Sequence, residues 1–180
     1  MLLDEKRMAV FAGQELQYLL EIDSVSGNEA EMLLYLEKRC RDMGLPTKQQ
    51  KVVGERYNLL VNPLSFPELM ITAHVDTVPP VINGTPCRHE IVGERFYGRG
   101  AADVKGGIAS LLAALNEITI RSSEGTENIP PVMIAFNIDE ERSGCGSEKL
   151  ARLGGRYAVV IEPTEMKLCT AQCGSAVLHL

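Results

Sequence analysis

Met70-Ile-Thr-Ala-His74-Val-Asp76-Thr-Val-Pro-Pro80 begins like a buried strand and ends in two ionisable side chains. A short apolar run that stops before a proline pair is typical of a strand inside a sheet. His74 and Asp76 are two residues apart, so in an extended chain their side chains point the same way. The end of this strand is therefore the first candidate for a functional position.

The same pattern recurs further along the chain. Short apolar runs at 132–138 and 158–161 predict two more buried strands, and acidic residues follow each of them. Helical patterns cover roughly 5–21, the segment from about 26 to 44, and 108–120, while hairpins are predicted at 51–61 and around 93–94. Strands that alternate with helices predict an α/β fold, a three-layer α/β/α arrangement with a mixed, mostly parallel sheet.

Ligands of such sheets bind beyond the carboxyl ends of the strands. Taken singly, each acidic strand end is more often a polar residue that simply meets water. Together they predict one site, because parallel strands end at the same edge. The residues expected there are His74, Asp76, Asp103, Asp139, Glu140, Glu141 and Glu162.

Neighbouring carboxylates repel one another unless a cation offsets their charge. One His among several acids favours zinc, with cobalt or manganese as alternatives, over magnesium or calcium. Asp76 is expected to accept the second ring N–H of His74, or else only to cap the following turn. Of Glu140 and Glu141, one can hold metal while the other accepts a proton from metal-bound water.

The glycine-rich segment Gly98-Arg-Gly-Ala-Ala-Asp103-Val-Lys-Gly-Gly107 superficially resembles a phosphate-binding loop. The order of Lys105 and Gly106 does not fit the P-loop pattern, and Asp103 stands where a dinucleotide fingerprint needs glycine. A carboxylate there would repel phosphate. We expect the glycines to let the backbone turn tightly and bring Asp103 to the site.

Composition excludes several classes of protein. The net charge is -6, and no cluster of Lys and Arg is present, which argues against nucleic-acid binding. No apolar run is long enough to span a membrane, and the N-terminus lacks a signal-peptide pattern. The five cysteines are scattered, and the pair Cys169 and Cys173 has no partner pair, so reduced thiols and a cytoplasmic location are expected.

Four motifs in this order resemble one family. His74-Val-Asp76, the Gly98–Gly107 segment, Asp139-Glu140-Glu141 and Glu162-Pro163-Thr164 are similar to the dinuclear zinc metallopeptidases and deacylases that include acetylornithine deacetylase, succinyl-diaminopimelate desuccinylase, aminoacylase and carboxypeptidase G. Each motif alone is weak, but the four together are specific. The resemblance runs from about residue 22 to the end of the chain.

The resemblance implies a role for each matching residue. His74 and Glu162 would bind one of two divalent metal ions, Glu141 would bind the second, and Asp103 would bridge both. Glu140 would be the general base and Asp76 would orient His74. The peptide bond after Asp103 is expected to be cis. The implied reaction is hydrolysis of the amide bond of an N-acyl amino acid by metal-activated water.

Family members continue with a lid domain and then a second part of the catalytic domain. Those parts supply further His residues, one of them often across a homodimer. Residues 1–180 are therefore expected to be the N-terminal portion of the metal-binding catalytic domain, ending before the lid. Neither His89 nor His179 matches a motif, so both are expected to be surface or structural residues.

Three readings of the function remain. The first is an N-acyl amino acid deacylase, and the second is a di- or tripeptidase or carboxypeptidase of the same family. The third is a catalytically incompetent fragment or metal-binding remnant that needs a partner chain. In every case the isolated chain is expected to bind at most one metal ion tightly and to be weakly active or inactive.

Overall fold

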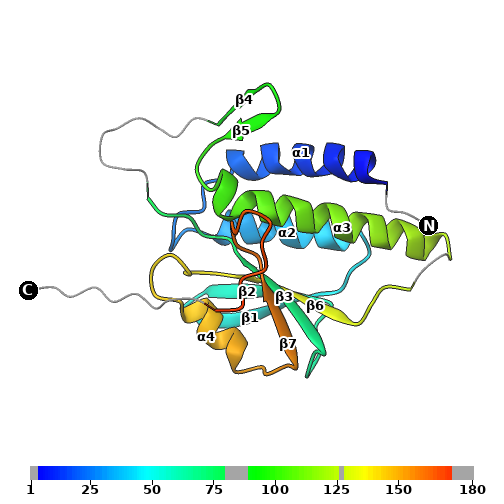
Figure 1. Ribbon diagram of the computed structural model, residues 1–180. Coiled ribbons are helices and arrows are strands. Elements are labelled where there is room, and N and C mark those ends of the chain that lie inside the picture. The colour runs from blue at the N-terminus through cyan, green and yellow to red at the C-terminus, as the bar shows by residue number, and fades with distance from the viewer. Residues whose placement is uncertain (1–3, 80–88, 126–127, 172–180) are drawn as a thin grey trace, which may run out of the picture.

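The computed structural model describes residues 4–79, 89–125 and 128–171 (Figure 1). Its helices are α1 (Glu5–Glu21), α2 (Ala30–Asp42), α3 (Gly106–Ser123) and α4 (Cys145–Ala151). Its strands are β1 (Thr47–Val53), β2 (Arg56–Val61), β3 (Leu69–His74), β4 (Glu90–Val92), β5 (Arg95–Tyr97), β6 (Val132–Asn137) and β7 (Tyr157–Val160). The predicted helices and both predicted hairpins are confirmed, and α4 is an element that the sequence patterns did not indicate.

Five strands form one sheet in the order β1-β2-β6-β3-β7. β3 pairs in parallel with β6 and β7, whereas β2 pairs antiparallel with β1 and β6. The sheet is therefore mixed, as predicted, and its parallel half contains the three strands that end in candidate site residues. The register places His74 opposite Asn137, so β3 and β6 end at the same edge.

The two faces of the sheet are covered by different helices, which gives the predicted three layers (Figure 1). α1, α2 and α3 lie on one side, over a large core that includes Leu59, Phe136 and Ile108. α4 lies on the other side, where Leu150 packs against a smaller core of Leu60, Met70, Met133 and Ala135. Neighbouring strand residues such as Leu59 and Leu60 belong to opposite cores, as the two-residue period of a strand requires.

Buried ion pairs join the helices of the larger layer. Glu15 on α1 accepts hydrogen bonds from Arg39 and Tyr35 on α2. Glu117 on α3 accepts from Arg7 on α1 and from Arg121 one turn along α3. Each buried carboxylate thus has a cationic partner, which avoids the large cost of an unpaired buried charge.

One prediction about the sheet is wrong. The segment 158–161 was expected to form a buried strand, but Val159 is 45% exposed and Val160 is 59% exposed. The reason is position, because β7 is the last strand of the sheet and β3 is its only neighbour among the described residues. An apolar run cannot by itself distinguish a central strand from an edge strand.

Within the described ranges, no helix has the length and apolar character needed to cross a bilayer. A small separate hairpin, β4 and β5, lies beside the N-terminal helix layer (Figure 1). The Phe96 side chain of this hairpin lies against α1, because a Cβ built on Gly13 would be 3.6 Å from Phe96 Cζ.

Candidate metal centre

His74 is the last residue of β3 and is buried, with 2% of its surface exposed. Its ring Nδ1 lies 2.9 Å from the backbone oxygen of Asp76, and its Nε2 lies 2.9 Å from Oδ1 of Asp103. The backbone oxygen can only accept, so it selects the Nδ1–H tautomer when the ring is neutral. That tautomer leaves Nε2 as the atom that can bind a metal ion.

Asp76 is buried beside His74, but its carboxylate makes different contacts from those predicted. The nearest carboxylate oxygen lies 3.7 Å from Nδ1 of His74, too far for a hydrogen bond. The carboxylate instead accepts from the backbone N–H groups of Glu140 and Glu141, at 3.0 and 3.2 Å, and from the hydroxyl of Ser26 at 2.7 Å. Asp76 therefore fixes the His74 ring through its backbone and the acidic loop through its side chain.

Asp103 lies in a wide turn, 101–105, that leads into α3. The Asp103–Val104 peptide bond is cis, which confirms the expectation drawn from the family resemblance. The turn begins at Gly100, whose φ of 73° is a left-handed conformation that favours glycine. This backbone turns the Asp103 carboxylate toward His74, so the glycine-rich segment positions a carboxylate at the site, as predicted.

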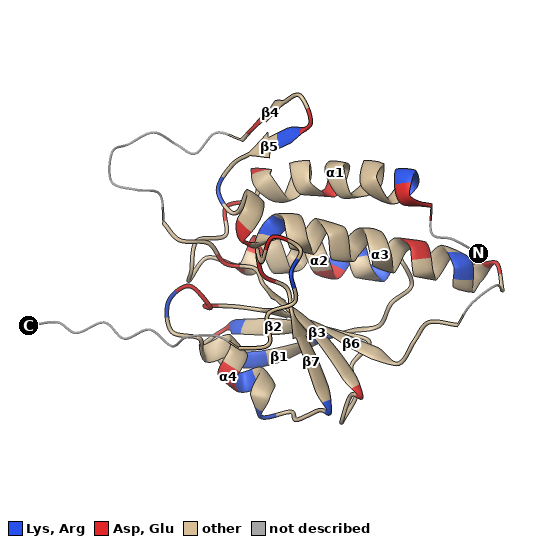
Figure 2. Ribbon diagram, viewed as in Figure 1, with Lys and Arg blue, Asp and Glu red and all other residues tan. Residues whose placement is uncertain are grey.

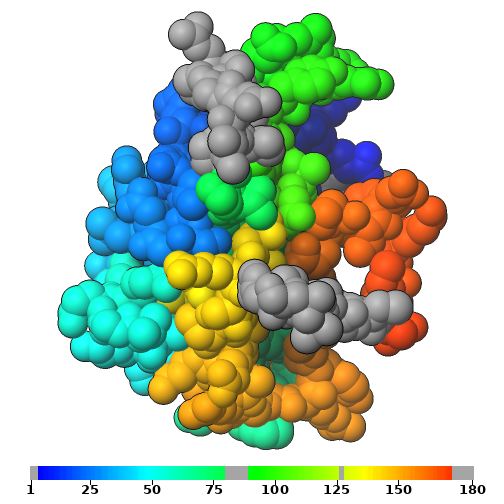
Figure 3. Space-filling model, turned by 90° about the vertical axis from the view of Figure 1, so that its left-hand side faces the viewer, coloured from blue at the N-terminus to red at the C-terminus, as the bar shows by residue number. Residues whose placement is uncertain are grey.

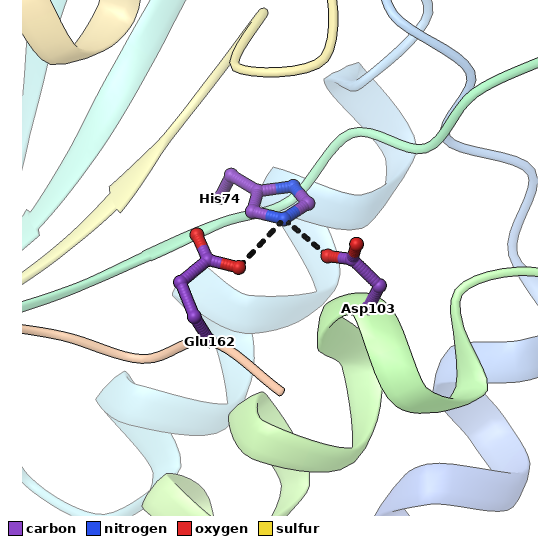
Figure 4. Close-up of side chains that lie close together, drawn as sticks. All are labelled: His74, Asp103 and Glu162. Carbon is purple, nitrogen blue, oxygen red and sulfur yellow. Dashed lines mark hydrogen bonds and ion pairs between the residues drawn. The ribbon is translucent and has the colours of Figure 1, made fainter. Parts of the chain in front are cut away.

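Glu162 follows β7 and approaches His74 from a third element (Figure 4). Its Oε2 lies 3.9 Å from Nε2 of His74. The N–H of Ile161 donates to the carbonyl of Thr72, which carries the pairing with β3 one residue past the end of β7. Close packing also matters here, because a Cβ on Gly107 would lie only 2.4 Å from Cγ2 of Ile161.

Glu140 and Glu141 belong to the loop after β6. The loop begins at Asp139, which has a left-handed φ of 63° and accepts hydrogen bonds from Arg56 and from the hydroxyl of Ser143. Ligand atoms of His74, Glu140 and Glu141 lie within 4.8 Å of one another. The same holds for His74, Asp103 and Glu162.

The six residues to which the family resemblance assigns a role therefore meet at one edge of the sheet. Figure 2 shows acidic segments on the loops at this edge, and in Figure 3 the segments after β3 (green), β6 (yellow) and β7 (orange) adjoin on one face. Within the described residues, the two triads that could hold a metal ion share His74.

The carboxylates of this cluster oppose one another's ionisation. Burial and the charge of Asp103 raise the pKa of Glu141. Burial also raises the pKa of Glu162, and the charge of Asp103 adds to the increase while His74 opposes it. Burial lowers the pKa of His74, but the hydrogen bond to Asp103 and the charge of Glu162 outweigh it, so the pKa is raised. A cation bound between these carboxylates would therefore offset their mutual repulsion.

The donor set fits a divalent metal ion. A tetrahedral zinc ion with ligands at about 2.1 Å holds two ligand atoms about 3.4 Å apart. The distances from Nε2 of His74 to Asp103 and Glu162, 2.9 and 3.9 Å, lie on either side of that value. Imidazole with carboxylates suits zinc, cobalt or manganese, so the geometry agrees with the expected class of metal.

Three residues that support the site were not indicated by the sequence reasoning. Ser26 contacts Asp76 and lies in the Ile22–Gly27 stretch where the family resemblance starts. Arg56 joins Asp139 to the buried Glu29, and an arginine in a hairpin gives no local sequence signal of such a role.

Lys105 is the third supporting residue. It is 3% exposed, and its Nζ donates to the carbonyl of Ile22 at 2.8 Å. Its position in the sequence, between Val104 and Gly106 at the start of a buried helix, is the feature that could have predicted its burial.

The remaining candidates stay outside the cluster. His89 is half-buried and lies 3.7 Å from a carboxylate oxygen of Glu21. Cys169 is exposed. His179 and Cys173 lie outside the described residues.

Comparison with known proteins identifies a family. A model of peptidase family M20/M25/M40 matches residues 70–174, more than half of the chain and a range that includes every residue expected at the site. The chain is 29% identical over 175 residues to a probable carboxypeptidase of Aspergillus clavatus, covering 87% of this chain and 37% of that protein. It is also 29% identical over 166 residues to acetylornithine deacetylase of Aliivibrio fischeri, covering 84% and 42%.

The fold is similar to that of an M20 family metallo-carboxypeptidase from Sulfolobus solfataricus, with a TM-score of 0.66 and 21% identity. That similarity covers 83% of this chain and 37% of the solved chain. The chain spans about two fifths of the length of the curated relatives it matches.

Proposed function

The chain belongs to peptidase family M20/M25/M40, and on that premise we propose that it is the metal-binding N-terminal portion of a hydrolase that cuts the amide bond of an N-acyl amino acid. The observation that carries the proposal is the meeting of His74, Asp103, Glu162, Glu140 and Glu141 at one edge of the sheet. A divalent ion bound there supplies Lewis acidity, which polarises a carbonyl and makes water a stronger acid.

We assign the ligands from the contacts of each side chain. His74, Asp103 and Glu162 hold the first ion, because their donor atoms already converge. The family resemblance implies that Glu141 holds the second ion of the complete protein together with Asp103, and Glu141 is half-buried and lies in the triad with His74 and Glu140. Zinc is the metal that this donor set favours, with cobalt and manganese as alternatives.

Glu140 is the residue best placed to move protons. It is exposed, and its side chain makes no hydrogen bond or ion pair with a described residue, while its backbone N–H is held by Asp76. A carboxylate that is fixed at its backbone and free at its side chain can accept a proton from the attacking water. The same carboxyl group then delivers that proton to the leaving amine.

A peptidase of the same family is the second candidate. It is favoured by the probable carboxypeptidase and the metallo-carboxypeptidase among the similar proteins. Deacylation and peptide cleavage both hydrolyse an amide bond, so they can use the same metal centre and base. They differ in what lies on the acyl side of that bond.

The test is an assay of the complete gene product that contains this chain, loaded with zinc, on matched panels of N-acetyl amino acids and dipeptides. We expect a higher kcat/KM on the N-acetyl panel. Replacing Glu140→Gln should lower kcat about 10²–10⁴-fold, the usual contribution of a general base, with zinc content unchanged. The isolated 180-residue chain should hydrolyse both panels poorly.

Three results would contradict the proposal. A preference for dipeptides would favour the peptidase reading. Zinc binding without hydrolysis of either panel would favour a catalytically incompetent remnant. Full activity after Glu140→Gln would remove Glu140 as the base.

A further inference from the structure

The acidic loop after β6, which begins at Asp139, is held at two separate points. At the first, the carboxylate of Asp76 accepts the backbone N–H groups of Glu140 and Glu141. At the second, the buried carboxylate of Asp139 accepts a hydrogen bond from the guanidinium of Arg56. Asp139 also begins a turn, because its φ of 63° is left-handed and its carbonyl accepts two N–H groups further along the loop. Arg56 therefore holds the residue from which the loop turns.

Both anchors of the loop rest on one segment, residues 26–29. Ser26 donates its hydroxyl to Asp76 at 2.7 Å. Glu29, at the start of α2, accepts from Nε of Arg56 at 3.0 Å and from a second nitrogen of the same guanidinium. The Glu29 carboxylate also accepts a backbone N–H from within the segment, at 2.8 Å. The contacts thus form a closed network, which runs from the loop through Asp76 to this segment and returns to the loop through Arg56.

Arg56 supplies the positive charge of this network. Glu29 and Asp139 are 1% and 3% exposed, and no other Lys or Arg in the described ranges forms an ion pair with either of them. A guanidinium suits this place because its planar fork of N–H groups can bind two carboxylates in fixed directions. Without Arg56, two buried carboxylates would lack a cationic partner. The loop, which is neither helix nor strand, is the part of the network that can move to relieve that cost.

We propose that Arg56 is a positioning residue, which acts through Asp139 to set where the acidic loop lies relative to His74. Arg56 belongs to neither of the two metal triads. Its consequence for the reaction rests on the proposed function, in which Glu140 is the base and Glu141 a metal ligand. Its hold on the loop itself requires no metal ion.

The first test measures the loop directly in the metal-free 180-residue chain. Hydrogen exchange of the Glu140 and Glu141 amides is followed by NMR in the wild type and in two variants. In Arg56→Met these amides should exchange roughly tenfold faster, as the loss of a charge-assisted hydrogen bond that holds the loop predicts. Arg56→Lys should fall between Arg56→Met and the wild type, because an ammonium keeps the charge and loses the fork. The lysine variant also decides the question if Arg56→Met does not fold.

Arg39→Met is the matched control. The side chain of Arg39 is 26% exposed, against 28% for Arg56, and it also pairs with a buried glutamate, Glu15. That pair joins α1 to α2 and includes no residue of the acidic loop. Arg39→Met should therefore lower the free energy of unfolding, measured by denaturation, while the two loop amides exchange as in the wild type.

The second test asks whether the position of the loop matters for the reaction. In the complete gene product loaded with zinc, Arg56→Met should lower kcat roughly 10–100-fold with KM and zinc content unchanged, because a misplaced base slows proton transfer. Arg39→Met should change neither kcat nor KM. A role confined to stability would lower the amount of folded protein and leave the kcat of the folded fraction unchanged.

Three results would overturn the proposal. They are unchanged amide exchange in Arg56→Met, an equal acceleration of the loop amides in Arg39→Met, and faster exchange in Arg56→Met with kcat unchanged. If the wild-type gene product hydrolyses no amide substrate, that result counts against the proposed function instead. The amide exchange of the metal-free chain then still decides whether Arg56 holds the loop.

Discussion

The ends of β3 and β7 carry two members of one metal triad, His74 and Glu162, yet the protein supports these two strand ends very differently. β3 lies between β6 and β7, and both residues that follow its apolar run, His74 and Asp76, are nearly fully buried. β7 is an exposed edge strand, and Glu162 beyond it makes no hydrogen bond through its side chain to a described residue. The β3 end of the site is therefore held rigidly by burial and hydrogen bonds before any metal binds, whereas the β7 end is held mainly by strand pairing.

The difference matters for what each carboxylate does. Asp76 uses its oxygens to hold three N–H or O–H groups and so organises the acidic loop. Glu162 faces the shared His74 and other carboxylates, and its pKa is raised by burial and by Asp103. The Asp76 carboxylate stabilises the fold. The Glu162 carboxylate is destabilised in its charged form, and a metal ion would stabilise that form.

The largest expected effect on stability and zinc binding comes from replacing Asp76 by alanine, with Glu162→Ala as the comparison. Asp76→Ala leaves three donors without their acceptor and should lower the free energy of unfolding of the metal-free chain by roughly 2–4 kcal/mol. It should also weaken zinc binding about 10–100-fold, since the groups behind metal ligands typically contribute this much. Chemical denaturation and zinc titration measure the two effects.

Glu162→Ala is the matched control for stability. It removes a carboxylate whose pKa is raised, so at neutral pH the metal-free chain should be as stable as the wild type or slightly more stable. Zinc binding should still weaken, because a ligand is lost. Equal destabilisation by the two substitutions would show that the two strand ends are supported alike.

A smaller effect is expected from Lys105 in the buried turn beside the site. Burial lowers its pKa to about 8, whereas the unfolded chain keeps the ordinary value of 10.5. Between these values the unfolded state binds the extra proton, so the stability of the folded state rises with pH. In the metal-free chain, Lys105→Met should remove a rise of roughly 1–3 kcal/mol between pH 7.5 and pH 10.5.

Denaturation curves across that range check the prediction for Lys105. The exposed Lys51, replaced by methionine, should show no such difference from the wild type. If the free energy of unfolding of Lys105→Met and of the wild-type chain changed with pH in the same way, burial of the Lys105 ammonium would not destabilise the folded state.

Local pattern was enough to predict most of the sheet. β6 has an apolar run that is buried from both sides and β3 one that is partly buried, and the ionisable residues that follow them meet at one edge as expected. The cis bond after Asp103 was anticipated from the family resemblance, and its tight turn from the glycines around it. These features depend on residues close together in the chain or on one shared sheet edge.

The remaining features depend on contacts between distant segments. The helix α4 has little apolar pattern, and it is fixed by Gly146, which packs against the backbone of Ile138, and by Asn58, which bonds both. The exposure of β7 follows from its place in the strand order, which its own residues do not encode. The acceptor role of Asp76 toward Glu140 and Glu141 needs a partner loop more than sixty residues away.

The number of zinc ions bound by the isolated chain tests the shared role of His74 most directly. Both candidate triads contain His74, so calorimetric titration of the 180-residue chain should give one tight equivalent of zinc. His74→Ala should abolish tight binding. Two tight equivalents, or tight binding that survives His74→Ala, would contradict the single centre built around the end of β3.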